Sequence, residues 1–449
     1  MGKSTYFVYL PLEVFGRELD GKLLLAAELA SRGLTVVLGH KTVVKKYALD
    51  QRRRGVWYAL ACREKEAKFA RRLSEYGIVS VAQDEEAGTI YEKYSDFHRL
   101  RADHWHISDF SAFFCWGEDD YNFLCDQYPN DALKIYNTGS PRSALLGELG
   151  RNYYSDEIGV LKDKYGDFVL FVSGFQYGNG HVSQETRGAI GRSESIWARN
   201  SGDQLALLVE EERKLMRAFS DAIQLFAHEV DANVVLRPHP CENKEFWEAV
   251  AKPHSRVRVA SDRSATPWIL SSGLIIQNSS TVGLEACLCG TPAVAFSSSD
   301  VGFFRQNKRI PDLVMPRITS SDELVEYYRG LSGPTMPPSA GMDIAKKKIS
   351  FSGTGRSVMK QADIIEGLCQ DIPLRVSRDI AIRLYHKAKH FIGPKVDISV
   401  GSQNEINKRP EIHADYIRFK LPAVRRILSI SSDLKITGVG KSTFIIQNC

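Results

Sequence analysis

The feature that most constrains the fold is a repeated alternation of short β-branched or aromatic segments with segments of helical periodicity. The first helical segment carries an apolar stripe from Leu19 to Ala30 and ends at Gly33. Strands that alternate with helices form a parallel sheet that is covered by helices on both faces. In the first 150 residues, strands are predicted at TYFVYL (5–10), LTVVLG (34–39), VWYALA (56–61), IVSVAQ (78–83), SAFFCW (111–116) and LKIYNTG (133–139).

The alternation restarts after a polar stretch, residues 150–167. A long helix is predicted at 203–229, and the irregular segment 181–202 before it is a candidate lid. Two successive doubly wound domains place a cleft at the carboxyl ends of their strands. The strands predicted in this second series are FVLFVSG (168–174), ANVVLRPHP (232–240), SRVRVAS (255–261), GLIIQNSS (273–280) and TPAVAFSSS (291–299).

The predicted division of the chain has four parts. Residues 1–150 are predicted to form one Rossmann-like domain, and residues 151–355 are predicted to form a second. Helices within 356–391 pack back on the first domain, and 392–449 is a basic tail without an assigned structure. The tail contains GVGKST, which is not a P-loop, because the first required glycine is replaced by Lys435 and no helix follows.

Composition indicates a folded, globular chain, with 43% hydrophobic and 25% charged residues. No apolar run reaches the roughly 18–20 residues that cross a bilayer, so we expect neither a signal peptide nor an integral membrane protein. The eight cysteines form no C-x-x-C pair, which is typical of reduced thiols in the cytoplasm.

Positive charge is concentrated at the end of the chain. From Asp371 onward the chain has 14 lysines and arginines and 7 aspartates and glutamates, a net charge of +7. The whole chain has a net charge of +5, so residues 1–370 have a net charge of −2. The predicted partner of this basic tail is an anionic surface, such as the inner face of the cytoplasmic membrane, rather than a specific nucleic acid sequence.

One candidate site lies at the end of VVLRPHP (234–240). A buried strand would end in Arg237 and His239, and Pro240 would end its ladder of hydrogen bonds. Both side chains then lie at the carboxyl end of the strand, where doubly wound sheets bind ligands. A purely structural histidine is the competing interpretation.

A second candidate is GLIIQNSSTVGLEACLCGTPAVAF (273–296), in which a buried strand leads into hydroxyl residues that begin a helix. Hydroxyls and free N–H groups at a helix N-terminus suit a phosphate, although a plain N-cap is equally common. His239 and Ser279 are predicted to follow successive strands of one sheet, so both can face one ligand. The candidate residues are Asn278, Ser279, Ser280, Thr281 and Glu285.

A third candidate is acidic. Asp84, Glu85 and Glu86 follow the strand 78–83 and are predicted to open the next helix near Gly88. Carboxylates in the first turn of a helix usually have only a structural role, because they interact favourably with the helix dipole. At the carboxyl end of a central strand they can instead supply a general base or a nucleophile.

These motifs resemble those of bacterial GT-B glycosyltransferases that use CMP-activated sugars, the sialyltransferases among them. Further segments are similar to bacterial surface-carbohydrate biosynthesis proteins related to the Kdo transferases of capsule and O-antigen assembly. The similarity spans roughly residues 1–370. Its segments are PLEVFGREL (11–19), DEEAG (84–88), TGSPR (138–142), RPHP (237–240) and SSTVGLEACLCGTP (279–292).

The resemblance implies a GT-B fold in which the His-Pro and Ser-Ser motifs hold CMP. It makes 1–150 the acceptor-side domain and 151–355 the CMP-sugar-binding domain. It puts His239 near the phosphate, where it would stabilise charge, and it makes Glu85 or a neighbour the catalytic carboxylate. The acidic motif departs from the sialyltransferase form, because three acids and an alanine precede the glycine. Which carboxylate acts, and whether the anomeric centre is inverted or retained, stay open.

The leading hypothesis is a transferase that moves Kdo or a nonulosonic acid of the pseudaminic or sialic type from its CMP donor to a surface polysaccharide or glycolipid. The chain has no Asp-x-Asp pair, so we expect no metal-bridged diphosphate site. We expect no cofactor, because the CMP-activated sugar is a donor substrate. Arg17, Glu18 and Arg142 are candidate acceptor contacts. The alternatives are a UDP-sugar 2-epimerase, a CDP-glycerol glycerophosphotransferase and an inactive scaffold of polysaccharide assembly.

Overall fold

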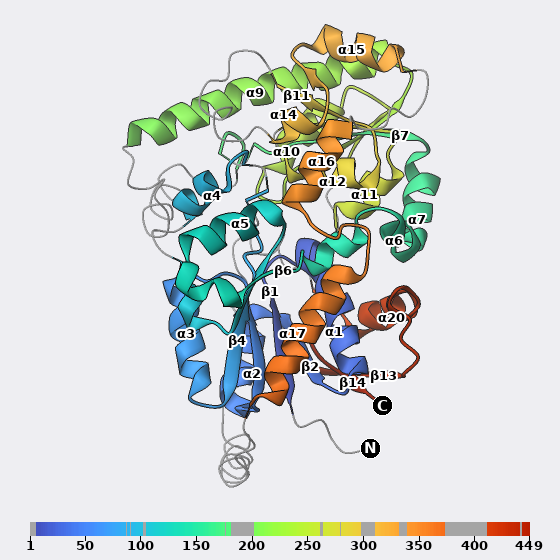
Figure 1. Ribbon diagram of the computed structural model, residues 1–449. Coiled ribbons are helices and arrows are strands. Elements are labelled where there is room, and N and C mark those ends of the chain that lie inside the picture. Colours follow the sequence, from blue (N-terminus) through green and yellow to red (C-terminus); the bar gives the residue numbers. More distant parts are fainter. Residues whose placement is uncertain are drawn as a thin grey trace. The chain divides into compact units, whose positions relative to one another are not determined.

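Two separate β-sheets organise the protein, each in its own unit (Figure 1). Unit 1 comprises Met1–Ala87, His104–Ala144 and Thr354–Cys449, and unit 2 comprises Gly88–Asp103 and Leu145–Gly353. The computed structural model describes residues 6–86, 88–89, 91–101, 105–175, 177–180, 202–260, 264–278, 280–297, 310–331, 339–372, 411–440 and 442–449.

The unit boundaries differ in detail from the predicted division. The chain leaves unit 1 after residue 144 and returns at residue 354. In addition, residues 88–103, which include helix α4 (Tyr94–Arg101), belong to unit 2.

The sheet of unit 1 contains six parallel strands and a C-terminal hairpin, in the order β13-β14-β2-β1-β3-β4-β5-β6. The six strand segments predicted before residue 150 are confirmed. Most of their residues are buried, as expected for a parallel sheet with helices on both faces. The parallel strands are β1 (Phe7–Leu12), β2 (Thr35–His40), β3 (Gly55–Ala59), β4 (Ile78–Ala82), β5 (Ala112–Cys115) and β6 (Ile135–Asn137).

Helix α1 (Phe15–Ser31) is buried along nearly its whole length. Its predicted apolar stripe is in the core, and Gly33 follows the helix with φ of 88°. The helix packs against α17 (Arg356–Gln370) and α20 (Ala414–Leu428), so segments distant in sequence cover one helix (Figure 1). The other helices described in unit 1 are α2 (Lys41–Gln51), α3 (Glu64–Ser74) and α5 (Glu118–Gln127).

The C-terminal segment that the sequence left unassigned forms part of the unit 1 sheet. Strands β13 (Leu434–Gly440) and β14 (Thr443–Asn448) form a hairpin, and β14 pairs antiparallel with β2. A Cβ at Gly39 of β2 would lie 2.4 Å from the Ser442 carbonyl oxygen, so this close approach requires glycine. The turn of the hairpin falls within GVGKST, which confirms that this sequence is not a P-loop.

The sheet of unit 2 has the order β12-β11-β10-β7-β8-β9, and all its pairings are parallel. This is the doubly wound Rossmann order. Strands β8 and β9 are added to one side of β7, and the chain then crosses back and adds β10 and the later strands on the other side. The five predicted strands are confirmed, and the short β12 was not predicted. The strands are β7 (Phe168–Val172), β8 (Asn233–Arg237), β9 (Val257–Val259), β10 (Leu274–Gln277), β11 (Ala293–Phe296) and β12 (Arg317–Ile318).

The long helix predicted at 203–229 is α9 (Gly202–Glu229), and it packs against α15 (Ser321–Arg329). Phe219 and Phe226 of α9 pack on Phe171 of β7. Residues 181–201 of the predicted lid lie outside the described residues. None of the described helices combines the length and the apolar character that crossing a bilayer requires. The other helices of unit 2 include α6 (Glu148–Tyr153), α7 (Ser155–Tyr165), α10 (Lys244–Ala251), α11 (Thr266–Ser271), α12 (Thr281–Cys289), α14 (Ile310–Val314) and α16 (Ser339–Lys348).

Candidate functional site

The predicted phosphate residues of unit 2 follow β8 and β10, which flank β7. Because all three strands are parallel, their carboxyl ends share one edge, at the point where the strand order reverses. His239 and Ser279 were predicted to follow successive strands. This is corrected in one respect, since the chain crosses back over the sheet and β7 lies between them. Strands two places apart are separated by about 10 Å, so a ligand at the end of β7 can be reached from both sides.

His239 is exposed just beyond the end of β8. Its ring Nδ1 accepts a hydrogen bond from the amide of Cys241 at 3.2 Å. A ring nitrogen that accepts carries no proton, so the proton of the neutral imidazole is on Nε2. The histidine is therefore oriented to donate from Nε2.

Glu242 fixes the loop that carries His239. Its buried carboxylate accepts hydrogen bonds from the His239 amide at 3.0 Å, the Ser173 hydroxyl at 2.9 Å and the Trp247 indole N–H at 2.8 Å. Burial raises the pKa of Glu242, and the hydrogen bonds oppose this shift. Glu242 was not predicted from the sequence, although an acid two residues after RPHP was a signal for it.

The loop after β7 is held in the same way. The Glu212 carboxylate accepts hydrogen bonds from the amides of Tyr177 and Gly178, both at 2.6 Å. Asn179 and Asn243 exchange two hydrogen bonds, of 2.6 Å and 3.1 Å, which join this loop to the loop after β8. The edge of the sheet beside His239 is thus rigid on two sides.

The second predicted motif forms the N-terminus of α12. The Ser280 hydroxyl accepts the Val282 amide at 3.2 Å as the N-cap, and the Ser280 amide donates to Gln277 at 2.7 Å. A serine that caps through its oxygen can still donate its own proton to an anion. Asn278 is buried and donates to the Phe296 carbonyl at 3.3 Å, so it supports the strand end.

The remaining residues predicted in unit 2 differ in position. Thr281 is the first residue of α12 and is half-buried, whereas Glu285 is buried one turn further along. Arg237 is the buried last residue of β8, paired with Val172 of β7, and Pro240 follows His239. Ser279 lies outside the described residues.

The acidic motif in unit 1 forms a turn, which corrects the prediction that it opens a helix. The Asp84 carboxylate accepts the Glu86 amide at 2.9 Å, and the Asp84 carbonyl accepts the Trp116 indole N–H at 2.9 Å. Gly88 has a left-handed φ of 63°, and α4 begins only at Tyr94. A side chain that bonds to the backbone two residues on favours a turn over a helix.

Within this turn, Glu85 is buried and Glu86 is exposed. Glu85 lies 2.9 Å from the ammonium of Lys22, which is on α1. Lys22 in turn lies 3.1 Å from the centre of the Tyr58 ring on β3. Neither Lys22 nor Tyr58 was predicted. The signal for Lys22 is a single lysine beside Leu23, within the buried stripe of α1.

Two further charges flank this ion pair. Arg17 bridges Glu18 at 3.0 Å and Glu86 at 3.1 Å. Glu18 accepts the amides of Glu13 and Val14 at 2.7 Å and 3.1 Å, which closes the first turn of α1. Burial raises the pKa of Glu18, Arg17 opposes this shift, and the negative charge of Glu85 adds to it.

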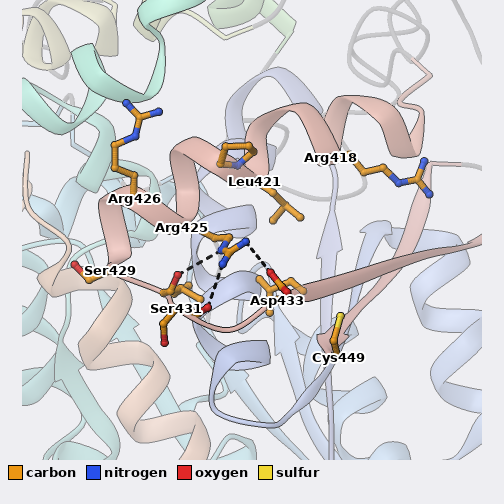
Figure 2. Close-up of a pocket in the computed structure, with 11 residues that line it drawn as sticks. Arg418, Leu421, Arg425, Arg426, Ser429, Ser431, Asp433 and Cys449 are labelled. Carbon is orange, nitrogen blue, oxygen red and sulfur yellow. Dashed lines mark hydrogen bonds and ion pairs between the residues drawn. The ribbon is translucent and has the colours of Figure 1, made fainter.

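A groove of about 790 Å³ lies beside α20 in unit 1, lined by residues between 418 and 434 and by Cys449. Figure 2 shows Arg425 directed into it, bonded to Asp433 and to the Ser431 carbonyl, while Arg418 and Arg426 extend away. Because the charge of Arg425 is balanced internally, the groove is not our candidate active site.

Among the residues that the structure describes, no three His, Cys, Asp or Glu side chains are grouped as metal ligands would be. That the sugar is transferred from its nucleotide donor without a metal stays a prediction.

Comparison with solved structures identifies the fold. UDP-GlcNAc 2-epimerase of Methanocaldococcus jannaschii, in complex with UDP-GlcNAc and UDP, matches 81% of this chain and 99% of its own, with 12% identity and a TM-score of 0.50. A variant of the wall teichoic acid polymerase TagF, soaked with CDPG, matches 82% of this chain and 89% of its own, with 11% identity and a TM-score of 0.53. Neither a family model nor a curated protein matches the sequence. The protein has a GT-B fold with two Rossmann-like units, as predicted.

Proposed function

We propose that the protein is a glycosyltransferase that uses a nucleotide-activated sugar. More specifically, we propose a CMP-activated ulosonic acid, Kdo or a nonulosonic acid, as the donor and a glycan or glycolipid as the acceptor. The observation that carries the proposal is the pairing of an exposed, oriented His239 with the N-terminus of α12 at one sheet edge, on either side of β7.

The chemistry follows from what these groups can donate. Cleavage of the bond between the sugar and CMP leaves negative charge on one phosphate. The Nε2–H of His239 and the N-terminus of α12 can stabilise that charge through preorganised donors. In this proposal Glu85 is the carboxylate that either deprotonates the acceptor hydroxyl or attacks the anomeric carbon.

A second candidate is transfer of glycerol phosphate from CDP-glycerol. The TagF variant that shares the fold was soaked with CDPG, and the same histidine and hydroxyl groups could bind the phosphates of CDP-glycerol. The UDP-GlcNAc 2-epimerase has the same fold at a similar TM-score, so the fold alone does not choose among these activities.

A nucleotide screen tests the proposal. In thermal-shift experiments with EDTA present, CMP should stabilise the protein more than CDP, UDP or GDP. Binding is detectable in this way because a ligand at 100 times its Kd stabilises the folded protein by about 2.7 kcal/mol. Incubation with CMP-Kdo should then release CMP as the Kdo group passes to the hydroxyl of an added glycan acceptor or to water. Stabilisation by UDP and not by CMP would contradict the proposal, and preferential stabilisation by CDP, with turnover of CDP-glycerol, would favour the second candidate.

A further inference from the structure

We infer that Lys22 is a positioning residue for Glu85, whose carboxylate it holds charged and fixed in place at the ends of β3 and β4. The inference rests on the proposed function for the catalytic role of Glu85. The ion pair itself is a property of unit 1 alone.

Burial is the first step of the argument. The side chain of Lys22 is 3% exposed and that of Glu85 is 6% exposed. Removing either ion from water is costly, and the close opposite charge offsets that cost only partly. Replacing such a pair by apolar residues is often neutral or stabilising, so stability alone is a poor explanation for it.

The surroundings of the ammonium are the second step. Lys22 has the Glu85 carboxylate at 2.9 Å and the Tyr58 ring at 3.1 Å. Burial lowers the pKa of Lys22, and the charges of Glu85 and then Glu18 oppose this shift. Burial raises the pKa of Tyr58, and the negative charge of Glu85 raises it further. The phenol therefore stays neutral.

Rigidity is the third step. The Tyr58 hydroxyl bonds to Gln83 at 2.9 Å and to Gln361 at 3.0 Å, so its ring is fixed under Lys22. The Glu85 amide donates to the Leu60 carbonyl at 3.3 Å. A functional carboxylate supported from three elements is held more precisely than one on a free loop.

The sign of the effect follows from the remaining charges. Glu18 and Glu86 are the nearby acids, and Arg17 is already bonded to both. Without Lys22, a buried Glu85 would face the negative charge of Glu18, and the charge of Arg17 would be shared with Glu18 and Glu86. Glu85 would then take up a proton at a higher pH than in the wild type.

The test measures the charge of Glu85 directly. Protein labelled with ¹³C at the glutamate side-chain carboxyls is titrated by NMR, and the Glu85 resonance is assigned as the one lost in Glu85→Gln. In Lys22→Met, its protonation midpoint should move upward by about one pH unit or more. In the control Lys348→Met, which removes a buried lysine that donates to the Glu92 carbonyl, the Glu85 midpoint should stay in place. An unchanged midpoint in Lys22→Met overturns the inference.

A double variant covers the case in which Lys22→Met does not fold. Lys22→Met with Glu85→Gln should then recover a folded protein, because no buried charge lacks its partner. A double variant that also fails to fold overturns the inference.

Turnover separates this inference from the proposed function. If the wild type releases CMP from CMP-Kdo, Lys22→Met should move the acid limb of its pH–rate profile to higher pH. An unmoved limb overturns the positioning role. If the wild type releases no CMP, the donor assignment fails, while the NMR titration still decides the link between Lys22 and Glu85.

Discussion

The Glu242 carboxylate accepts the Ser173 hydroxyl at 2.9 Å and thereby ties the end of β7 to the loop that carries His239. Glu242→Gln should lower the free energy of unfolding by about 1–3 kcal/mol, because an amide N–H₂ would face groups that donate. It should also weaken CMP binding by displacing His239. Urea unfolding and calorimetry measure the two effects. Glu248→Gln, which breaks only a surface pair with Lys244, is the matched control and should change both little.

The same group has a pH signature. Since burial raises the pKa of Glu242, its folded form binds a proton more readily than its unfolded form. The part of the stability that comes from proton binding to Glu242 is therefore complete below the unfolded pKa of about 4.3, and it is lost as pH rises through the folded pKa. The stability difference between wild type and Glu242→Gln should change through that window. A difference independent of pH there would contradict the burial argument.

His239→Ala should weaken the stabilisation by CMP and lower turnover by about 10²-fold or more, because a preorganised donor at the developing charge is lost. His254→Ala is the matched control, since His254 precedes β9 and so lies at the amino end of that strand. Thermal shift and CMP release measure the two variants. Wild-type turnover in His239→Ala would leave this histidine with a structural role only.

We expect Glu85→Gln to lose turnover. We expect most of the wild-type turnover to remain in Glu86→Gln and in Asp84→Asn. Glu86 is 49% exposed and paired with Arg17, and such surface pairs contribute about 0–1 kcal/mol. Asn at position 84 keeps an oxygen that can accept the Glu86 amide. Initial rates of the three variants make the comparison. A 10²-fold loss in Glu86→Gln, with Glu85→Gln active, would assign the catalytic role to Glu86.

Ile446→Ala should destabilise unit 1 by about 2–5 kcal/mol, because Ile446 of β14 is fully buried beside β2. Thr437→Ala on β13, where the side chain is exposed, is the control and should cost well under 1 kcal/mol. Denaturant unfolding compares the two. Equal, small effects would mean that the hairpin does not dock on the sheet.

The predicted attraction to anionic membranes is best tested on α20, because deleting the segment after Gln370 would also remove β14 from the sheet. Arg418 and Arg426 are exposed on this helix, and Phe419 beside them is 55% exposed. Arg418→Glu with Arg426→Glu should reduce co-sedimentation with phosphatidylserine vesicles, since each basic residue near the surface contributes about 1 kcal/mol.

High salt should weaken the wild-type binding by screening. Lys68→Glu on α3 is the control, an exposed lysine outside this helix. Binding that is equal in all variants, or that is insensitive to salt, would contradict the role of α20.

The sequence predicted the parallel strands and the long helices because burial on both faces leaves continuous apolar runs, such as those around Val36 and Ile275. It located the ends of β8 and β10, but not the placement of β7 between them, because strand order is a long-range property. The local pattern marked Asp84, Glu85 and Glu86 together, and the resemblance pointed to Glu85 among them. Lys22, the partner of Glu85, is 63 positions earlier, and only tertiary packing brings the two together.

The hairpin was missed for a related reason. Thr443 to Asn448 reads as a single short strand, and its partner β2 ends at His40. A pairing across 400 positions leaves no periodic trace near either strand.

This long-range pairing also determines the order in which the protein can fold during synthesis. All strands of unit 2 precede β13, so that unit can close while unit 1 still lacks its last two strands. At about 5–20 residues per second, roughly 20–80 s separate the synthesis of β2 from that of β14. Throughout this interval β2 presents an open backbone edge, which is a template for pairing with other chains. The unit that is begun first is therefore completed last, and chaperones have most to protect at the edge of β2.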